Sequence, residues 1–284
     1  PVGISFYTFQ TLSYTLDIYY RKFEPTKDPL AFFAFVSFFP QLVAGPIERA
    51  RLLLPQFLEN KSVRYVQLRS GLLLMAWGFF KKIVIADRLA IFVDGAYGSI
   101  ETLDGISAMV AVLFFAFQLY LDFSAYSDIA IGCASLFGFN LSTNFRRPYL
   151  ALSFSDFWKR WHISLSTWFK DYLYIPLGGN RLGKYQHMRN ILIVFSVSGL
   201  WHGASWNFVI WGVLNGLFVL LFNNFFKKAS FQLGTRIAAS IWVSLCWALS
   251  LVFFRAPSFT DALALFSHIG MSSQEVLYSY GLNA

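Results

Sequence analysis

The chain has 284 residues, of which 56% are hydrophobic, 20% aromatic and 13% charged, and its formal net charge is +8. An ordinary soluble domain has about 25% charged residues, so this composition excludes a typical soluble domain and predicts a protein embedded in lipid. The basic residues gather in loops between apolar runs, which favours membrane topology over nucleic-acid binding as the reason for the positive charge.

Apolar runs follow one another along the whole chain. A membrane-spanning helix needs roughly 20 predominantly apolar residues. Two shorter runs, 5–18 and 32–43, are expected to be buried, re-entrant or incomplete. The candidate spans are 72–93, which Lys81 and Lys82 interrupt, then 106–121, 191–226 and 237–254. This pattern predicts an all-α polytopic membrane protein.

Charge distribution in the loops predicts their orientation. Segment 144–189 has eight basic and two acidic residues, and loop 45–70 is also rich in Lys and Arg. Loop 94–104 has three acidic residues and no basic residue. Because excess Lys and Arg marks the cytoplasmic side, we expect the first two segments in the cytoplasm and loop 94–104 outside.

A polar interruption follows the run 106–121. Asp122, Ser124, Ser127 and Asp128 come directly before a second apolar stretch, 129–139. Polar residues at this depth need protein or water around them, so we expect a break in the helix here. Two carboxylates without a neighbouring His or Cys are a weak metal signal, and no metal site is predicted. Both aspartates are expected to cap the break or to accept internal hydrogen bonds.

The segment 153–172, SFSDFWKRWHISLSTWFKDY, has the pattern of a single amphipathic helix. Ser153 and Asp156 fit a capping box, which places the helix start near residue 154. His162 projects among the aromatic residues, and the pattern is typical of a helix at the membrane interface with its charged side toward water. The apolar face is expected to hold Phe154, Trp158, Trp161, Leu165, Trp168 and Phe169.

The run 191–226 is too long for one span. Its 36 residues are free of charge, and as one helix they would extend roughly 54 Å, against a ~30 Å hydrocarbon core. Two pairs of glycines at four-residue spacing (Gly199 and Gly203, Gly212 and Gly216) suit close helix packing and a broken or re-entrant path. We expect His202 at a helix break or helix end, in a cavity lined by Trp201, Trp206 and Asn207.

His202 and His162 are the candidate catalytic residues. An ionisable side chain deep in a membrane is rare and indicates function, although a neutral histidine hydrogen-bonded between packed helices is the structural alternative. A neutral imidazole can take a proton from an attacking hydroxyl, which is the role of a general base. His162 would orient the acceptor or stabilise the oxyanion, and its alternative is a buried packing residue.

A basic cluster adjoins the 153–172 segment. It consists of Arg146, Arg147, Lys159 and Arg160. These charges are explained equally by topology and lipid headgroups, or by the mouth of a site for an anionic, phosphorylated acyl donor such as acyl-CoA.

Two sequence blocks carry a family resemblance. RWHISLSTWFKDYLYIPLGGNR and SGLWHGASWNFVIWGVLNGL resemble the membrane-bound O-acyltransferase family, in particular its bacterial alginate O-acetyltransferase branch. PVGISFYTFQTLSYTLDIYYR, FFPQLVAGPIERARLLLPQF and LYLDFSAYSDIAIG are also similar to that branch. The match runs from residue 1 to about residue 255, so residues 1–284 are expected to be one membrane-embedded domain whose flanking helices are missing at both ends.

The resemblance implies a site and a reaction. His202 would be the catalytic histidine and His162 its second polar residue, in a helical fold with broken helices around a central funnel. No cofactor would be bound; the donor would be a cytoplasmic thioester, acetyl-CoA, and the acceptor an alginate-like extracytoplasmic polysaccharide. The protein would lie in the bacterial inner membrane and work with membrane lipid around it and a periplasmic acetyl-transfer partner protein.

Three other functions fit parts of the sequence. A D-alanyl transferase acting on a teichoic acid-type polymer shares the RWH block, but the tract DYLYIPLGGNR favours the polysaccharide branch. A transporter could use an intramembrane histidine as a proton relay, but its usual signature of two matching repeats is not found. A non-catalytic membrane scaffold would differ from an enzyme in transferring no acetyl group from acetyl-CoA.

Overall fold

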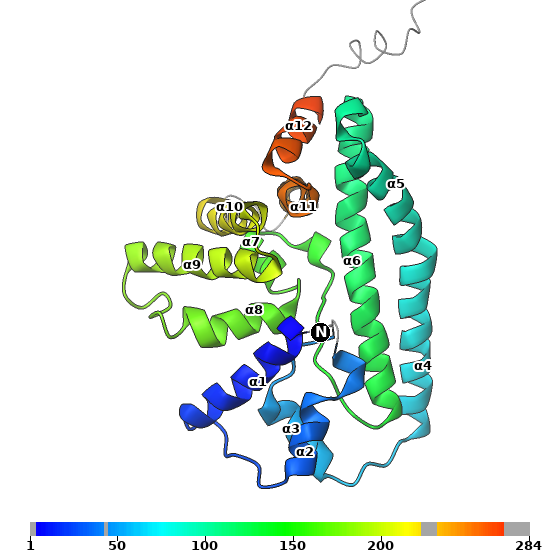
Figure 1. Ribbon diagram of the computed structural model, residues 1–284, viewed down its shortest axis with the longest axis vertical. Coiled ribbons are helices and arrows are strands. Elements are labelled where there is room, and N and C mark those ends of the chain that lie inside the picture. The colour runs from blue at the N-terminus through cyan, green and yellow to red at the C-terminus, as the bar shows by residue number, and fades with distance from the viewer. Residues whose placement is uncertain (1–3, 43–44, 223–231, 270–284) are drawn as a thin grey trace, which may run out of the picture. The chain divides into compact units, whose positions relative to one another are not determined.

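The computed structural model describes residues 4–42, 45–222 and 232–269, and these residues contain helices and no strand (Figure 1). The predicted all-α class is therefore confirmed. Within these described ranges, two helices are long and apolar enough to cross a membrane, α6 (Gly105–Leu136) and α11 (Leu233–Arg255). The chain divides into two compact units. The first comprises Pro1–Val84, Leu121–Pro148 and Trp158–Pro176, and the second comprises Ile85–Tyr120, Tyr149–Phe157 and Leu177–Ala284.

The first unit is built on a small aromatic and aliphatic core. Phe35 and Leu53 are fully buried in it, and Phe38 lies against the rings of Phe57 and Phe139. Asp28 begins α2 because its carboxylate accepts the backbone N–H groups of residues 30 and 31. The early elements of this unit are α1 (Ile4–Tyr19), α2 (Pro29–Val36), η1 (Phe39–Gln41) and α3 (Ala50–Leu58).

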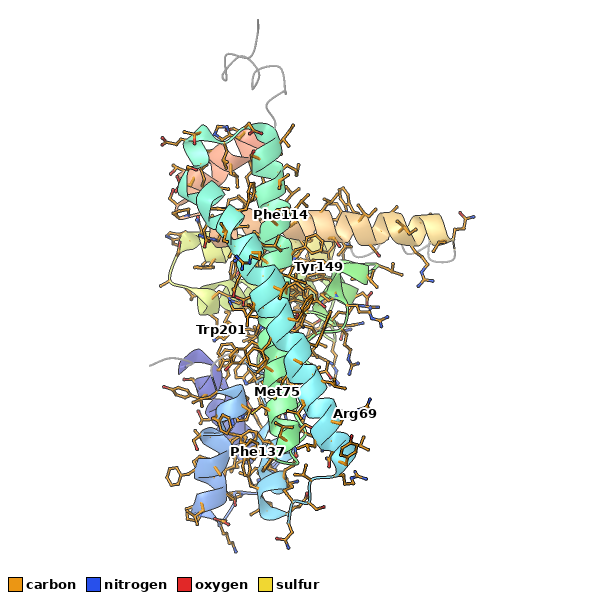
Figure 2. The ribbon with its side chains drawn as sticks, turned by 90° about the vertical axis from the view of Figure 1, so that its right-hand side faces the viewer. Arg69, Met75, Phe114, Phe137, Tyr149 and Trp201 are labelled. Carbon is orange, nitrogen blue, oxygen red and sulfur yellow. The ribbon has the colours of Figure 1, made fainter. Side chains whose placement is uncertain are left out.

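The predicted span 72–93 lies in a longer helical stretch. It runs through α4 (Tyr65–Phe79), the π-helical segment η2 (Phe80–Ala86) and α5 (Asp87–Gly98). Figure 2 shows α4 alongside α6, with Met75 on the side of α4 that faces it. The two backbones can approach closely because Gly71 and Gly132 have no side chain. A side chain at either position would meet the carbonyl oxygen of the other glycine.

The break expected at residues 122–128 is wrong, because α6 is one helix of 32 residues. The two carboxylates are accommodated by lysines of the π-helical segment instead. Lys81 Nζ lies 2.7 Å from Asp128 Oδ2 and 2.9 Å from Ser124 Oγ, and Lys82 Nζ lies 2.8 Å from Asp122 Oδ1. Asp128 is thus an internal hydrogen-bond partner, which was one of its two predicted roles. A carboxylate that pairs with a lysine of a neighbouring helical segment can be accommodated without a break in the helix that carries it.

The single helix expected over 153–172 is also wrong, because the segment divides into three pieces. They are α7 (Phe154–Trp158), α8 (Ile163–Phe169) and the π-helical η5 (Lys170–Tyr174). The start near residue 154 is confirmed, since Ser153 Oγ accepts the backbone N–H of Asp156. The chain turns at His162, whose φ of 42° and ψ of 55° are left-handed and end the helical repeat. The α8 face is buried as predicted, with Trp168 stacked 4.0 Å from Phe9 of α1.

In the second unit, α9 (Lys184–His202) and α10 (Trp206–Phe222) pack against each other through close backbone contacts. A side chain at Gly199 would overlap the carbonyl oxygen of Phe208, and one at Gly212 would overlap that of Phe195. The small residues therefore allow the backbone contact that their spacing predicts. Residues 223–226, the end of the predicted run 191–226, lie outside the described residues.

The remaining elements of the second unit pack around α11. Trp247 of α11 is buried against Phe157 of α7, with 4.7 Å between ring centroids. At its last residue, Arg255 pairs with Asp94 of α5 at 2.7 Å, so this acidic residue of the predicted outer loop has a basic partner. The other short elements are η3 (Ile100–Thr102), η4 (Pro148–Leu150) and α12 (Phe259–Ile269).

Candidate active site

His202 is the last residue of α9, and α10 begins four residues later at Trp206. The helix end predicted at this histidine is therefore confirmed. Gly203 follows directly, and the ring of Phe208 occupies the space that a side chain at residue 203 would need. The chain can thus reverse tightly between two helices and leave the imidazole at the turn.

Three aromatic rings surround the His202 imidazole. The centroids of Trp201, Trp211 and Phe254 lie 4.8, 5.1 and 5.2 Å from its centroid, each at a steep interplanar angle. The His202 side chain makes no hydrogen bond to any residue that the structure describes. This differs from a packing histidine, which is normally hydrogen-bonded between helices. Both ring nitrogens remain available to a hydroxyl and to a proton acceptor.

The predicted cavity residues beside His202 differ in their surroundings. Trp206 is 79% exposed at the start of α10, whereas Trp201 lies against the imidazole. Asn207 is 4% exposed, and its side-chain amide donates to the carbonyl oxygen of Ala256 at 3.2 Å. Of the two partners expected for Asn207, substrate or backbone, the backbone partner is present. The substrate-binding role of all three residues stays a prediction.

His162 belongs to the first unit, where it is 2% exposed. Its ring lies 4.6 Å from that of Phe123 at 81°, and 6.3 Å from that of Phe6. The left-handed backbone at this residue turns the chain between α7 and α8. His162 thus belongs to the first unit and His202 to the second.

Asn144 holds the His162 turn, and no pattern in the sequence singles it out. It is fully buried, and its backbone carbonyl accepts the N–H of Ile163 at 3.0 Å. Its side-chain oxygen accepts both the N–H and the hydroxyl of Ser164, and its amide donates to Ser127. Asn is common in loops, so only these contacts, 17 to 20 residues away in sequence, distinguish it from an ordinary loop residue.

All four residues of the predicted basic cluster lie in the first unit. The backbone N–H of Arg146 donates to the carbonyl of Arg160 at 2.9 Å, so the two basic tracts run side by side. Arg146, Arg147 and Lys159 are exposed, and Arg160 is partly buried. The backbones of the two tracts are therefore adjacent, next in sequence to the His162 turn.

A buried ion pair was also missed at the level of sequence. Arg49, which the sequence places in a basic loop, is 5% exposed and lies 3.2 Å from Asp171. Its guanidinium stacks 4.6 Å from the Tyr172 ring, and the Tyr172 hydroxyl donates to Asp17. Burial lowers the pKa of Arg49, while Tyr172 and Asp171 act in the opposite direction. The signal was hidden because the two partners are 122 residues apart.

The comparisons with known proteins agree with the sequence blocks. The family model of the membrane-bound O-acyltransferases matches residues 19–256. A peptidoglycan O-acetyltransferase of Helicobacter pylori is 39% identical over 93% of the chain and 55% of its own length. A probable alginate O-acetylase of Pseudomonas aeruginosa is 38% identical over 99% and 52%. A teichoic acid D-alanyltransferase of Streptococcus thermophilus is 25% identical over 80% and 58%.

These matches define the class of protein: the chain belongs to the membrane-bound O-acyltransferase family and is a membrane protein. Within the family it is more similar to the two O-acetylating relatives than to the D-alanyltransferase. The chain spans about half the length of the curated relatives it matches.

Proposed function

We propose that the protein of which this chain is part transfers an acetyl group from a cytoplasmic thioester to hydroxyls of an extracytoplasmic, alginate-like polysaccharide. The two O-acetylating relatives support acetyl transfer to a polysaccharide. They are 39% and 38% identical to the chain and match 93% and 99% of its residues. Family membership favours acyl transfer over proton-coupled transport and over a scaffold role. The lower identity of the D-alanyltransferase makes a teichoic acid-type acceptor the second choice.

The observation that carries the proposal is the placement of His202 at a helix end, among three aromatic rings and without a hydrogen bond to a described residue. A general base must have a free nitrogen within hydrogen-bond reach of the proton that it removes. The imidazole takes the proton of the attacking hydroxyl while the hydroxyl oxygen bonds to the acetyl carbonyl carbon. The carbon–sulfur bond then breaks, and the proton passes to the departing thiolate, which leaves as a thiol.

His162 is proposed as the second polar residue of the reaction. A buried imidazole between aromatic rings can donate to an oxyanion or hold the acceptor hydroxyl in line. Asn144 is a positioning residue in this scheme, because its hydrogen bonds hold Ile163 and Ser164, the two residues that follow the turn.

The basic cluster (Arg146, Arg147, Lys159 and Arg160) is proposed as the donor's entrance. Acetyl-CoA is polyanionic, and exposed Lys and Arg side chains would attract its phosphates. The donor is then a substrate, with no resident cofactor in the scheme. Trp201, Trp206 and Asn207 are proposed to contact substrate near His202.

The rest of the proposal concerns location. We place the protein in the bacterial inner membrane as a multi-pass domain, with a funnel from each side leading to His202 and a periplasmic partner receiving or directing the acetyl group. The helix break after His202 supports the funnel, since irregular backbone at membrane depth is tolerated where it lines a cavity.

Mass spectrometry of the cell's polysaccharides tests the proposal. Cells carrying the full-length protein should have O-acetyl groups on an exported polysaccharide, and cells with His202→Ala should lose them at equal protein level. Acetyl groups appearing on peptidoglycan alone would change the acceptor but keep the reaction. D-alanyl esters in place of acetyl groups, or no ester dependent on the protein, would contradict the proposed reaction.

A further inference from the structure

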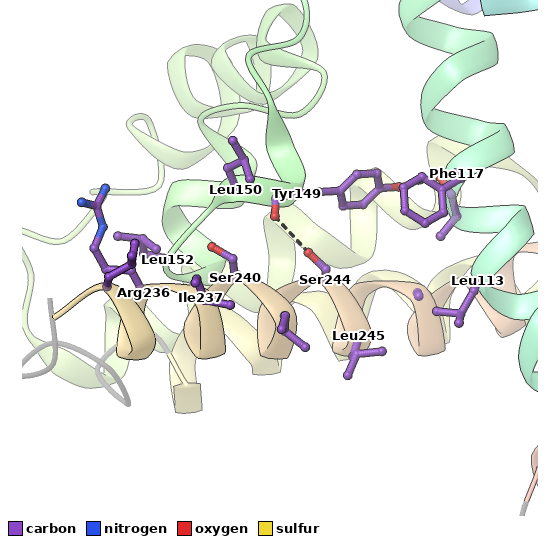
Figure 3. Close-up of a pocket in the computed structure, with 14 residues that line it drawn as sticks. Leu113, Phe117, Tyr149, Leu150, Leu152, Arg236, Ile237, Ser240, Ser244 and Leu245 are labelled. Atoms are coloured by element: carbon purple, nitrogen blue, oxygen red, sulfur yellow. Dashed lines mark hydrogen bonds between the residues drawn. The ribbon is translucent and has the colours of Figure 1, made fainter. Parts of the chain in front are cut away.

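A long apolar groove lies in the second unit, and His202 is not among the residues that line it. Its volume is about 620 Å³, which is in the range of small-molecule sites. Figure 3 shows the groove running along α11, with side chains of α6 and of residues 149–152 facing it from the other elements. Most of the lining is aliphatic or aromatic, including Leu113, Phe117, Leu150, Ile237 and Leu245. A channel of this composition fits a hydrocarbon chain.

The polar groups of the groove are not spread evenly. Arg236 is its single charged lining residue and lies at the end where α11 begins, as Figure 3 shows. Ser240 comes one turn later, and the hydroxyl of Ser244 donates to the carbonyl oxygen of Tyr149 at 3.3 Å. From there to Ala248 the lining is apolar. The groove therefore has a cationic end and a hydrocarbon end.

Arg236 lies at the start of an apolar helix that is long enough to accompany an acyl chain. α11 is one of the two helices that can cross a membrane, and Arg236 is in its first turn. From Arg236 to Ala248 the helix rises roughly 18 Å. A chain whose headgroup lies at Arg236 would thus extend roughly 18 Å along α11 to the apolar end.

The charge around this end favours an anionic ligand. Arg236 is exposed, and its guanidinium forms no ion pair with any residue that the structure describes. The sequence contains no acidic residue between Asp171 and Asp261, so the chain supplies no carboxylate nearby along its length. A basic side chain at the interface attracts the phosphate of an anionic lipid.

We propose that this groove is a binding site for an anionic phospholipid, with one acyl chain along α11 and the phosphate on Arg236. The site is separate from the proposed acetyl transfer and does not depend on it. A bound lipid would cover the apolar lining and hold α11 against α6 and residues 149–152.

The test uses the purified full-length protein and a phosphatidylglycerol with a photoactivatable group near the end of one acyl chain. After illumination, mass spectrometry of peptides should place the adduct on groove residues such as Leu113, Phe117 or Leu245. Ser240→Trp, which fills the groove, should abolish this adduct. Ala238→Trp on the same helix is the matched control, because Ala238 is exposed and does not line the groove, and it should keep the adduct.

A second pair of variants tests the headgroup. Arg236→Gln should lower phosphatidylglycerol occupancy about fivefold in native mass spectrometry, the effect expected for one basic side chain at an anionic surface. Arg88→Gln, an exposed residue of α5 outside the groove, should leave occupancy unchanged. Adducts outside the groove, or equal adducts in Ser240→Trp and Ala238→Trp, would overturn the proposal. So would a groove closed by another part of the full-length protein, seen as a Ser240→Cys thiol that maleimide cannot label even after the protein has been stripped of lipid in detergent.

Discussion

At the scale of residues, the hydrogen bonds of Asn144 fix the turn that carries His162. Asn144→Ala would leave the N–H of Ser164 buried without its acceptor, at a cost of about 1–3 kcal/mol. We expect a lower apparent melting temperature by tryptophan fluorescence in detergent. Asn180→Ala, at an exposed position, is the control and should stay within ~0.5 kcal/mol of the parent protein. Equal melting temperatures for the two variants would rule out this role for Asn144.

The sequence predicted the position of His202 at a helix end, but it did not predict the roles of Asn144 and Arg49. A histidine in the middle of a charge-free run too long for one helix had to lie near a break, and α9 does end at that residue. Asn144 and Arg49 have no such signal, because their roles depend on partners far away in sequence. Long-range polar contacts are decided by tertiary packing, which a local pattern does not contain.

At the scale of elements, the contact of α9 with α10 depends on glycine. Gly199→Ala would place a methyl group into the backbone of α10 at Phe208, and overpacking of this kind typically costs about 1–3 kcal/mol. Gly95→Ala in α5 is the matched control, since no atom lies within 4 Å of its added carbon and alanine favours helix. We expect thermal unfolding to show a loss for the first variant and none for the second. A Gly199→Ala protein as stable as Gly95→Ala would mean that the two helices do not pack this closely.

A second expectation concerns the pairing of α6 with the π-helical segment. Lys81→Met would leave the Asp128 carboxylate without its buried partner, and breaking such a pair costs about 3–5 kcal/mol. The double variant Lys81→Met with Asp128→Leu should recover most of this loss. Lys82→Met should cost less, because the Lys82 and Asp122 side chains are 44% and 46% exposed. If the double variant unfolds at the same temperature as Lys81→Met, the unpaired Asp128 carboxylate is not the cause of the lost stability.

The two misjudged elements have a common physical cause. Asp122 and Asp128 looked like a break in the sequence, but lysines of a neighbouring segment neutralise them and the helix continues. In residues 153–172 the helical period is continuous, yet the backbone turns at His162, and Asn144 binds the two residues that follow it. In both places tertiary contacts outweigh the local pattern. The apolar run 237–254 lies wholly within α11, because no charged residue interrupts it; the helix begins four residues earlier and ends one residue later.

At the scale of the whole molecule, the proposed orientation rests on loop charge. In a background with Cys133 and Cys246 replaced by alanine, a cysteine at Ser99 should react with an impermeant thiol reagent added outside intact cells. A cysteine at Lys184 should react only after the membrane is opened. Both positions are exposed, so access to the reagent depends on the side of the membrane. The reverse labelling pattern would show that the chain has the opposite orientation in the membrane.

The central claim is that His202 is the base of an acetyl transfer. Membranes containing the full-length protein should transfer labelled acetyl from acetyl-CoA to the polysaccharide, and His202→Ala should reduce the rate about 10²–10⁴-fold at unchanged protein level. His187→Ala, in the first turn of the same helix, should keep the rate near that of the parent protein. If His202→Ala transferred acetyl groups within about twofold of the parent rate, His202 would be a packing residue and the proposed general-base mechanism would be contradicted.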